Sequence, residues 1–173
     1  MLRNQPKAAK PAAVRIVAIK PYKMMQTTCK ATISKADPGQ RGAIIQLLQA
    51  EGLPVEDLPA SLNDFFVAKD AGNIIGAIGM ERYGDGGLLR SLVVDKAYRN
   101  KNIASLLVQA LEKSAAAMGI TSMYLLTETA PQYFTNKGYQ TCSRDEVPAE
   151  LKASSEFSHV CPASAIVMKK QLN

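Results

Sequence analysis

The residues best suited to bind an anion form a short basic turn, residues 96–102, which contains two lysines and an arginine. The turn follows a largely apolar run, residues 88–95, and precedes a longer segment, residues 103–118. Apolar side chains in that segment stand at positions 103, 106, 107, 110, 111, 115 and 118. This spacing is typical of one face of an amphipathic helix. Because a turn between a strand and a helix directs backbone N–H groups to the positive end of the helix dipole, the pattern predicts a phosphate cradle.

Two further groups of residues could carry chemistry. Arg90 stands inside an apolar strand pattern, where a charge needs a partner. It is interpreted either as an anion-binding residue of an acceptor site or as a salt-bridge partner of Glu81 or Asp85. Cys142 falls in the next-to-last predicted strand, and Cys161 stands two residues before the last one. They are interpreted either as a thiol pair for a soft metalloid or as two small core residues.

The composition is that of a soluble globular chain with one domain. Its 173 residues are 47% apolar and 21% charged. No apolar run approaches the roughly 20 residues of a membrane-spanning helix. The three cysteines, an odd number at scattered positions, do not suggest a disulfide framework, so a reducing cytoplasm is the expected compartment.

The net charge of +6 belongs to the N-terminal end. Residues 1–36 contain eight of the 21 Lys and Arg residues and no acidic residue, whereas the other 13 basic residues face all 15 acidic ones. Because the remainder is slightly acidic, the distribution argues against nucleic-acid binding. We expect a basic arm at residues 1–26 and the domain at residues 27–173. The arm is interpreted as a loosely packed extension, a targeting peptide or a tether to a polyanion.

Periodicity and turn residues predict alternating strands and helices. Asp37 and Pro38 begin a helix as N-cap and first helical residue, and Gly52 ends it. The other expected helices cover residues 103–118, 131–137 and 148–157. The expected strands cover residues 28–33, 65–68, 74–80, 88–95, 122–127, 139–143 and 163–169, with a short one at 14–19. This order predicts a three-layer α/β/α domain around a mixed sheet.

The element order, with a basic turn after the fourth strand of the domain, resembles the GNAT acetyltransferase superfamily. The family pattern Gln/Arg-x-x-Gly-x-Gly/Ala corresponds to residues 99–104, Arg-Asn-Lys-Asn-Ile-Ala. A second signature, Ala-x-x-x-Tyr-x-x-x-Gly-Phe, corresponds to residues 130–139, Ala-Pro-Gln-Tyr-Phe-Thr-Asn-Lys-Gly-Tyr. The resemblance covers residues 27–170. It implies a mixed, mostly antiparallel sheet whose central parallel strands splay apart.

A closer resemblance is to the branch of arsenic-resistance N-acetyltransferases. It is carried by Glu-Arg-Tyr-Gly-Asp at residues 81–85, Leu-Leu-Arg-Ser-Leu at residues 88–92 and Cys-Pro-Ala-Ser-Ala at residues 161–165. The name of that branch implies an association with arsenic-resistance genes more than a proven substrate.

The resemblance implies acetyl-CoA as donor and an amine as acceptor. The pantetheine arm would pair with the backbone of Leu92, Val93 and Val94, between the splayed strands. The pyrophosphate would rest on the turn, with charge added by its arginine and lysine. The implied cofactor-binding residues of the turn are Arg99, Asn100, Lys101, Asn102, Ile103 and Ala104. Although glycine is usual at positions 100 and 102, asparagine is the other residue that best tolerates positive φ.

The resemblance also points to acid–base residues. Glu81 and Glu128 lie at predicted strand ends that should face the cleft, where each is a candidate general base or a solvated surface carboxylate. The general-acid tyrosine of the family aligns with Phe134. Tyr133 is therefore a candidate acid only if the helix is rotated or irregular, and a packing residue otherwise. Arg90 is the candidate substrate-binding residue.

The leading hypothesis is a cytoplasmic N-acetyltransferase that uses acetyl-CoA and a small-molecule amine, with an arsenic-containing or otherwise toxic amino compound as one candidate acceptor. Two alternatives stay open: a non-catalytic acetyl-CoA sensor and a thiol-based metalloid-binding protein. No metal cofactor, nucleic acid or membrane partner is expected. The superfamily resemblance is consistent with a homodimer.

Overall fold

The computed structural model describes residues 30–160 and 162–172. The predicted basic arm and the strand expected at residues 14–19 lie outside this part, as does Cys161. The described strands form one seven-stranded sheet of order β1-β2-β3-β4-β5-β7-β6. Neighbouring strands are antiparallel except for β4 and β5, which are parallel. The predicted mixed, mostly antiparallel sheet is therefore confirmed.

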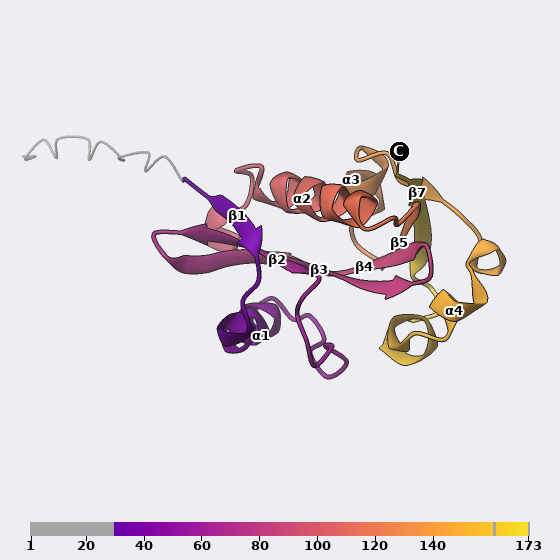
Figure 1. The fold of residues 1–173 in the computed structure, drawn as a ribbon, viewed down its shortest axis with the longest axis horizontal. Helices are drawn as coiled ribbons and strands as arrows, with labels where there is room; N and C mark the ends of the chain where they lie inside the picture. The colour runs from indigo at the N-terminus through magenta and orange to yellow at the C-terminus, as the bar shows by residue number, and fades with distance from the viewer. Residues whose placement is uncertain (1–29, 161, 173) are drawn as a thin grey trace, which may run out of the picture.

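The strands are β1 (Thr32–Lys35), β2 (Phe65–Asp70), β3 (Asn73–Tyr83), β4 (Gly86–Val94), β5 (Ser122–Thr127), β6 (Gln140–Thr141) and β7 (Ile166–Gln171). The α-helices are α1 (Arg41–Ala50), α2 (Ile103–Ala117), α3 (Pro131–Thr135) and α4 (Ala149–Lys152). Short 3-10 turns occupy Pro38–Gln40, Lys96–Tyr98 and Arg144–Glu146, and a π-helical turn occupies Glu156–Val160. In Figure 1, α1 covers one face of the sheet, and α2 and α3 cover the other. These are the three predicted layers.

Several element bounds differ from the prediction. β5 has the predicted bounds, and α2 ends one residue early, before Gly119 with φ +82°. β6 is shorter than expected and covers only Gln140 and Thr141; the N–H of Tyr139 before it donates to the Phe134 carbonyl in the turn after α3. The first strand starts only at Thr32. The helix expected at residues 148–157 is interrupted after α4, and the last strand starts at Ile166.

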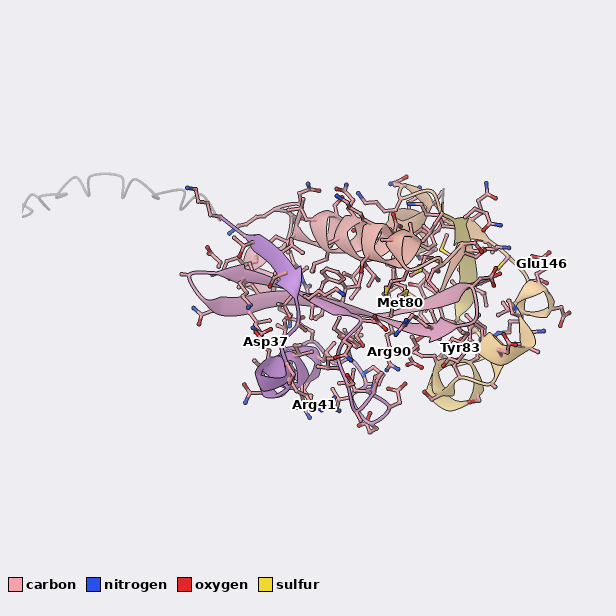
Figure 2. The ribbon with its side chains drawn as sticks, viewed as in Figure 1. Asp37, Arg41, Met80, Tyr83, Arg90 and Glu146 are labelled. Carbon is pink, nitrogen blue, oxygen red and sulfur yellow. The ribbon has the colours of Figure 1, made fainter. Side chains whose placement is uncertain are left out.

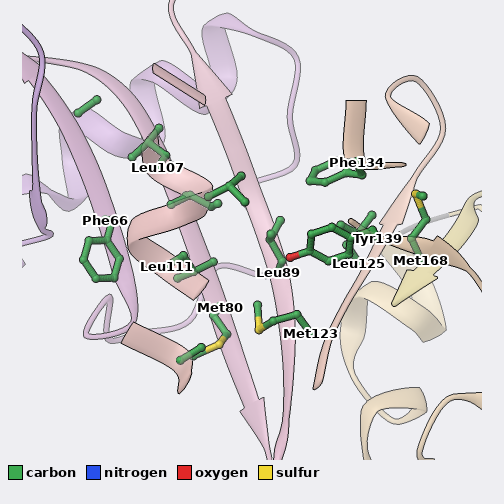
Figure 3. Close-up of a cluster of buried hydrophobic side chains, with 14 of the residues drawn as sticks. Phe66, Met80, Leu89, Leu107, Leu111, Met123, Leu125, Phe134, Tyr139 and Met168 are labelled. Atoms are coloured by element: carbon green, nitrogen blue, oxygen red, sulfur yellow. The ribbon is translucent and has the colours of Figure 1, made fainter. Parts of the chain in front are cut away.

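The core consists of apolar clusters on both sides of the sheet, because side chains alternate along each strand. On β2, Phe66 and Ala68 pack with the residues of α2, whereas Phe65 and Val67 pack with those of α1. Figure 3 shows the α2-side cluster, in which Leu107 of α2 lies near the sheet. A third cluster joins α4 to β4, β5 and β7. None of the described helices has the length and apolar character needed to cross a membrane.

Candidate active site between β4 and β5

The two parallel strands at the centre of the sheet are paired along only part of their length. Gly86–Leu88 of β4 pair with Ser122–Tyr124 of β5, and the pairing then stops although both strands continue. In the described part of the chain, no strand pairs with the β5-facing edge of residues 89–94. This edge therefore offers backbone donors and acceptors to a ligand lying between the strands.

A β-bulge in β4 accompanies this separation. Ser91 and Leu92 together stand opposite Ile78 of β3, and Ser91 has a positive φ of 56°. A bulge inserts one extra residue, bends its strand and increases the local twist. The bulge thus lies at the point where β4 turns away from β5.

Two cavities meet at this opening. The turn cavity, of about 380 Å³, is lined by Leu92, Val94, Tyr98, Arg99, Asn100, Asn102, Ile103, Ala104, Ser105, Tyr133 and Lys137. The cleft cavity, of about 580 Å³, is lined by residues 51–54, 89–92, 125–130, 133, 134, 156, 162 and 165. Leu92 and Tyr133 line both cavities, so a ligand that passes between the strands would bridge the two spaces at these side chains.

The turn before α2 has the conformation expected of a phosphate cradle. Asn100 and Asn102 both adopt left-handed backbone conformations, with φ of 61° and 63°. The side chain of Asn102 makes no capping hydrogen bond to α2. Because the first N–H groups of a helix have no partner within it, those of Ile103 and Ala104 remain available to a ligand in the turn cavity.

The predicted donor-site residues do not all reach the turn cavity. Leu92 and Val94 line it, whereas the Val93 side chain is buried on the α1 side, so only its backbone can meet a ligand. Arg99 lines the cavity and is ion-paired with Glu51. Lys101 does not line the cavity, and its Nζ lies 4.8 Å from the centre of the Tyr98 ring.

Arg90 is the centre of a buried ionic cluster. The residue is 4% exposed, and its side chain points from β4 to the side of the sheet that carries α1 (Figure 2). Nη2 lies 2.6 Å from Asp57 Oδ1 and 3.3 Å from Glu156 Oε1, and Nη1 donates to Glu81. Nη1 also donates to the Asp57 carbonyl, and Nε to the Ser91 hydroxyl.

The cluster leaves little room for Arg90 to bind an anionic substrate. The structure shows the salt bridge to Glu81 that was the alternative interpretation, whereas Asp85 accepts a hydrogen bond from Thr121 instead. Three carboxylates around one guanidinium have a formal sum of −2. A substrate anion would therefore have to displace one of them, and the local charge favours a cation instead.

The two candidate bases occupy different surroundings. Glu81 lies within β3 rather than at its end, because β3 continues to Tyr83, and it lines a neighbouring depression instead of the cleft cavity. Its other oxygen accepts a 2.7 Å hydrogen bond from Tyr83, whose pKa is raised to about 12 by burial and by this carboxylate. Glu128 follows β5, is exposed and lines the cleft cavity.

Tyr133 presents its ring, rather than its hydroxyl, to the opening. The side chain lines both cavities, but the hydroxyl oxygen is buried and has no hydrogen-bond partner among the described residues. Burial and the nearby Glu112 carboxylate raise the pKa of this hydroxyl. Phe134, at the position of the family's general acid, is buried with its ring centre 5.2 Å from that of Tyr133. Phe134 has no hydroxyl and that of Tyr133 is buried, so neither residue presents a proton donor to the cleft cavity.

Sequence reasoning missed several residues that line these cavities or contact Arg90. Asp57 lies in an irregular segment, and Glu156 in a π-helical turn, so no periodicity marks them. Lys137 was visible in the second signature, next to its glycine, but position alone gave it no role. Cys142 is a free thiol, and its proposed partner Cys161 lies outside the described residues, so the thiol pair stays a prediction.

Comparison with known protein families connects this geometry to an activity. Residues 61–141, which include β4, the turn and β5, match the family model for the acetyltransferase (GNAT) domain. Over these residues the chain is similar to GNAT acetyltransferase domains. The match covers the splayed strands, the basic turn and α3, whereas residues 51–54, 156, 162 and 165 of the cleft-cavity lining lie outside it.

Similar proteins are named as acetyltransferases. An uncharacterized N-acetyltransferase of Chlorobaculum tepidum is 29% identical over 129 residues, which cover 72% of this chain and 83% of that protein. An amino-acid acetyltransferase of Pasteurella multocida is 25% identical over 61% of this chain. This chain spans only 25% of the length of the Pasteurella protein, so the GNAT domain is the part they share. These relatives support N-acetyltransferase activity.

Solved structures show the same fold. N-acetylglutamate synthase from Neisseria gonorrhoeae, complexed with coenzyme A and N-acetyl-glutamate, superposes with a TM-score of 0.72 at 19% identity, over 83% of this chain and 35% of that one. A Mycobacterium tuberculosis protein in complex with CoA superposes with a TM-score of 0.69 at 21% identity, over 82% and 99% of the two chains. Both neighbours hold CoA on this fold.

Proposed function

We propose that this chain transfers the acetyl group of acetyl-CoA to the amine of a small molecule. The observation that carries the proposal is the opening between β4 and β5, with the turn cavity on one side and the carboxylate-lined cleft cavity on the other. The CoA held by neighbours of the same fold supports the choice of donor. The two cavities would hold the two substrates, with the thioester at Leu92 and Tyr133.

The donor would be held mainly by backbone groups. The N–H groups of residues 99–104 would receive the pyrophosphate, where the dipole of α2 adds to the attraction. The pantetheine amides would pair with the open edge of β4 from Leu92 to Val94, as a short extra strand would. Placing the thioester carbonyl against a fixed strand lowers the entropic cost of its reaction with an amine.

The acceptor would enter through the cleft cavity. Its lining includes Glu51, Glu128 and Glu156 with Arg90 as the one described cation. Glu51 is paired with Arg99 and Glu156 with Arg90, so Glu128 supplies the excess negative charge of the cavity. This charge attracts a protonated amine, which must then lose a proton before it can attack. Glu128 is the best-placed base, since Glu81 and Glu156 are bound to Arg90. The amine nitrogen then bonds to the acetyl carbon, the carbon–sulfur bond breaks, and CoA leaves as a thiolate that takes up a proton.

The activity is tested by thiol release from acetyl-CoA with a panel of amines, followed by mass spectrometry of the product. The panel should pair each amino acid with the matching amine that lacks the carboxylate. Because the cleft cavity is acidic, we expect the simple amine to have the higher kcat/KM. A measurable preference for amino acids would show that Arg90 is released from its cluster to bind the carboxylate.

A narrower acceptor class follows from the sequence resemblance at residues 81–85, 88–92 and 161–165. That resemblance suggests an amino compound that contains arsenic, which belongs in the panel beside its arsenic-free counterpart. Equal kcat/KM values for the two compounds would remove the arsenic link and leave the N-acetyltransferase proposal intact.

One observation favours a second candidate, an acetyl-CoA-binding module without turnover. The position of the family's general acid is occupied by Phe134, and the hydroxyl of Tyr133 is buried away from the opening. Tight binding of acetyl-CoA in a calorimeter, with no thiol release across the amine panel, is the result that this alternative requires. Turnover with any amine in the panel excludes it.

A further inference from the structure

We infer that Lys137 is a donor-binding residue whose ammonium group contacts a phosphate of acetyl-CoA. This inference rests on the proposed function and adds to the donor site a residue outside the basic turn. Lys137 lies between α3 and β6, 33 residues after the end of the 99–104 pattern. It nevertheless lines the turn cavity together with that pattern.

The local backbone directs Lys137 toward α2. Its N–H donates to the Phe134 carbonyl at 2.9 Å, and Gly138 follows with a positive φ of 87°, which turns the chain sharply toward β6. The Lys137 ammonium then donates to the hydroxyl of Ser105, in the first turn of α2, at 2.6 Å. The same ammonium lies 5.6 Å from the centre of the Tyr133 ring.

The charge of Lys137 is not neutralised by the protein. Among the described residues, no carboxylate lies within 4 Å of its ammonium, and its hydrogen-bond partner is a neutral hydroxyl. The other cation of the turn cavity, Arg99, is paired with Glu51, and Lys170 is paired with Glu112 at 2.7 Å. Because an ammonium has three N–H donors, Lys137 has two left for a ligand.

The ligand that fits this position is an anion in the turn cavity. The lining of that cavity contains Arg99 and Lys137 and no acidic residue. Ser105 holds Lys137 next to the N-terminus of α2, where Ile103 and Ala104 offer their N–H groups. A lysine binds phosphate as a point charge, and its attraction adds to that of the helix dipole. Of the chemical groups of acetyl-CoA, only the phosphates are anionic.

The test compares two donors that differ in their phosphates. S-acetylpantetheine contains the thioester and the pantetheine arm but no phosphate, whereas acetyl-CoA contains the thioester, the pantetheine arm and the phosphates. For Lys137→Met we expect KM for acetyl-CoA to rise about tenfold, the usual scale for a lost charge-assisted hydrogen bond. We expect kcat to change less than twofold and KM for S-acetylpantetheine to stay unchanged. Lys137→Arg, which keeps the charge, should recover most of the affinity for acetyl-CoA.

The matched control is Lys113→Met, which removes a lysine from the exposed face of α2, away from both cavities. It should leave the KM values for both donors unchanged. Ser105→Ala keeps the ammonium and removes only its support, so a small rise in KM for acetyl-CoA is expected. Melting curves of all variants show whether each one is folded.

Two results would overturn the inference. An equal rise in KM for both donors would mean that Lys137 supports Tyr133 and the pantetheine arm instead of a phosphate. No change for either donor would mean that it does not contact the donor. If the wild-type protein neither binds nor uses acetyl-CoA, the proposed function itself fails. If the wild type and Lys137→Met bind acetyl-CoA equally well, the inference about Lys137 fails and the proposed function stands.

Discussion

The two cavities at the opening of the sheet have opposite charge and are built in different ways. The turn cavity is lined by two cations and no acid, and most of its lining comes from one continuous segment, residues 92–105. The cleft cavity has three glutamates and one arginine, contributed by segments from residue 51 to residue 165. The proposed donor site is thus made mostly of one local segment, and the proposed acceptor site beside it is made of side chains from distant segments. The same sheet can keep the first while the second changes, because no single segment determines the acceptor side.

Arg90→Met gives the largest expected effect, and it tests whether the acceptor side depends on long-range ion pairs. The substitution would leave the partly buried carboxylates of Asp57, Glu81 and Glu156 without their common partner. Removing one member of a buried ionic network typically costs about 3–5 kcal/mol. We expect a loss of unfolding free energy of that size in urea denaturation at pH 7.

The control for this prediction is Arg82→Met. Arg82 pairs with Asp64 at 2.8 Å, but its side chain is 53% exposed, so the loss should be below about 1 kcal/mol. If Arg90→Met and Arg82→Met lose similar amounts of unfolding free energy, solvent screens the Arg90 cluster. The ion pairs of Arg90 then do not hold the acceptor side together.

Glu128→Gln tests the chemistry of the acceptor side. If Glu128 removes the proton from the amine, kcat/KM should fall by about 100-fold or more at neutral pH, since general-base catalysis contributes at least that much. The KM for acetyl-CoA should stay near the wild-type value, because the residue lines only the cleft cavity.

The matched control is Glu150→Gln, an exposed carboxylate on α4 that lines neither cavity. It should leave kcat/KM unchanged. A fall of less than threefold for Glu128→Gln would assign proton removal to water and leave the cleft carboxylates a purely electrostatic role.

Asn102→Val tests the donor side, where a backbone conformation matters more than a side chain. Residue 102 has a φ of 63°, which costs a non-glycine residue about 1–2 kcal/mol and is worst for β-branched side chains. We expect a loss of stability on that scale and a raised KM for acetyl-CoA. Asn102→Gly should preserve or slightly improve both quantities. An unchanged KM in the valine variant would separate donor binding from the shape of the turn.

Tyr83→Phe gives the smallest effect and probes the edge of the Arg90 cluster through pH. Folding raises the pKa of Tyr83 from 10.0 to about 12, so the folded protein holds this proton more tightly than the unfolded chain does. The wild type should therefore lose stability as the pH rises from about 10 to 12, and this dependence is absent below pH 10. In urea denaturation, the phenylalanine variant should be about 1 kcal/mol less stable at pH 7, because it lacks the hydrogen bond to Glu81. It should also lose less stability than the wild type between pH 10 and 12.

The difference between the two cavities also explains what the sequence could predict. The conformation of the turn before α2 was predictable because its signals are local: an apolar run, basic residues, and asparagines that then adopt φ of 61° and 63°. The Arg90 cluster was only half predictable. A charge in an apolar strand indicated that a partner exists, and Glu81 was named as a candidate. Asp57 and Glu156 lie 33 and 66 residues from Arg90 in irregular or π-helical backbone, and no pattern links such positions before the chain folds.

The bounds of the helices and strands were likewise predictable where the signals are local. β5 is a continuous apolar run between turns, and its bounds were predicted to the residue. β6 was predicted too long, because Tyr139 still belongs to the turn after α3, where its N–H donates to the Phe134 carbonyl. The burial of the Tyr133 hydroxyl was equally hidden, since no local pattern marks it, and neither does one mark the Glu112 carboxylate of α2 that helps to raise its pKa.

The short pairing of β4 with β5 has a consequence for the life of the protein in a cell. Three residue pairs connect the block of β1 to β4 with the block of β5, β7 and β6. A pantetheine arm bonded to the open edge of β4 would act as a temporary strand that closes the sheet. A ligand that binds only the folded state raises its stability with the logarithm of ligand concentration. Supply of the acetyl donor would then set how quickly this protein is unfolded and degraded, as well as how fast it works.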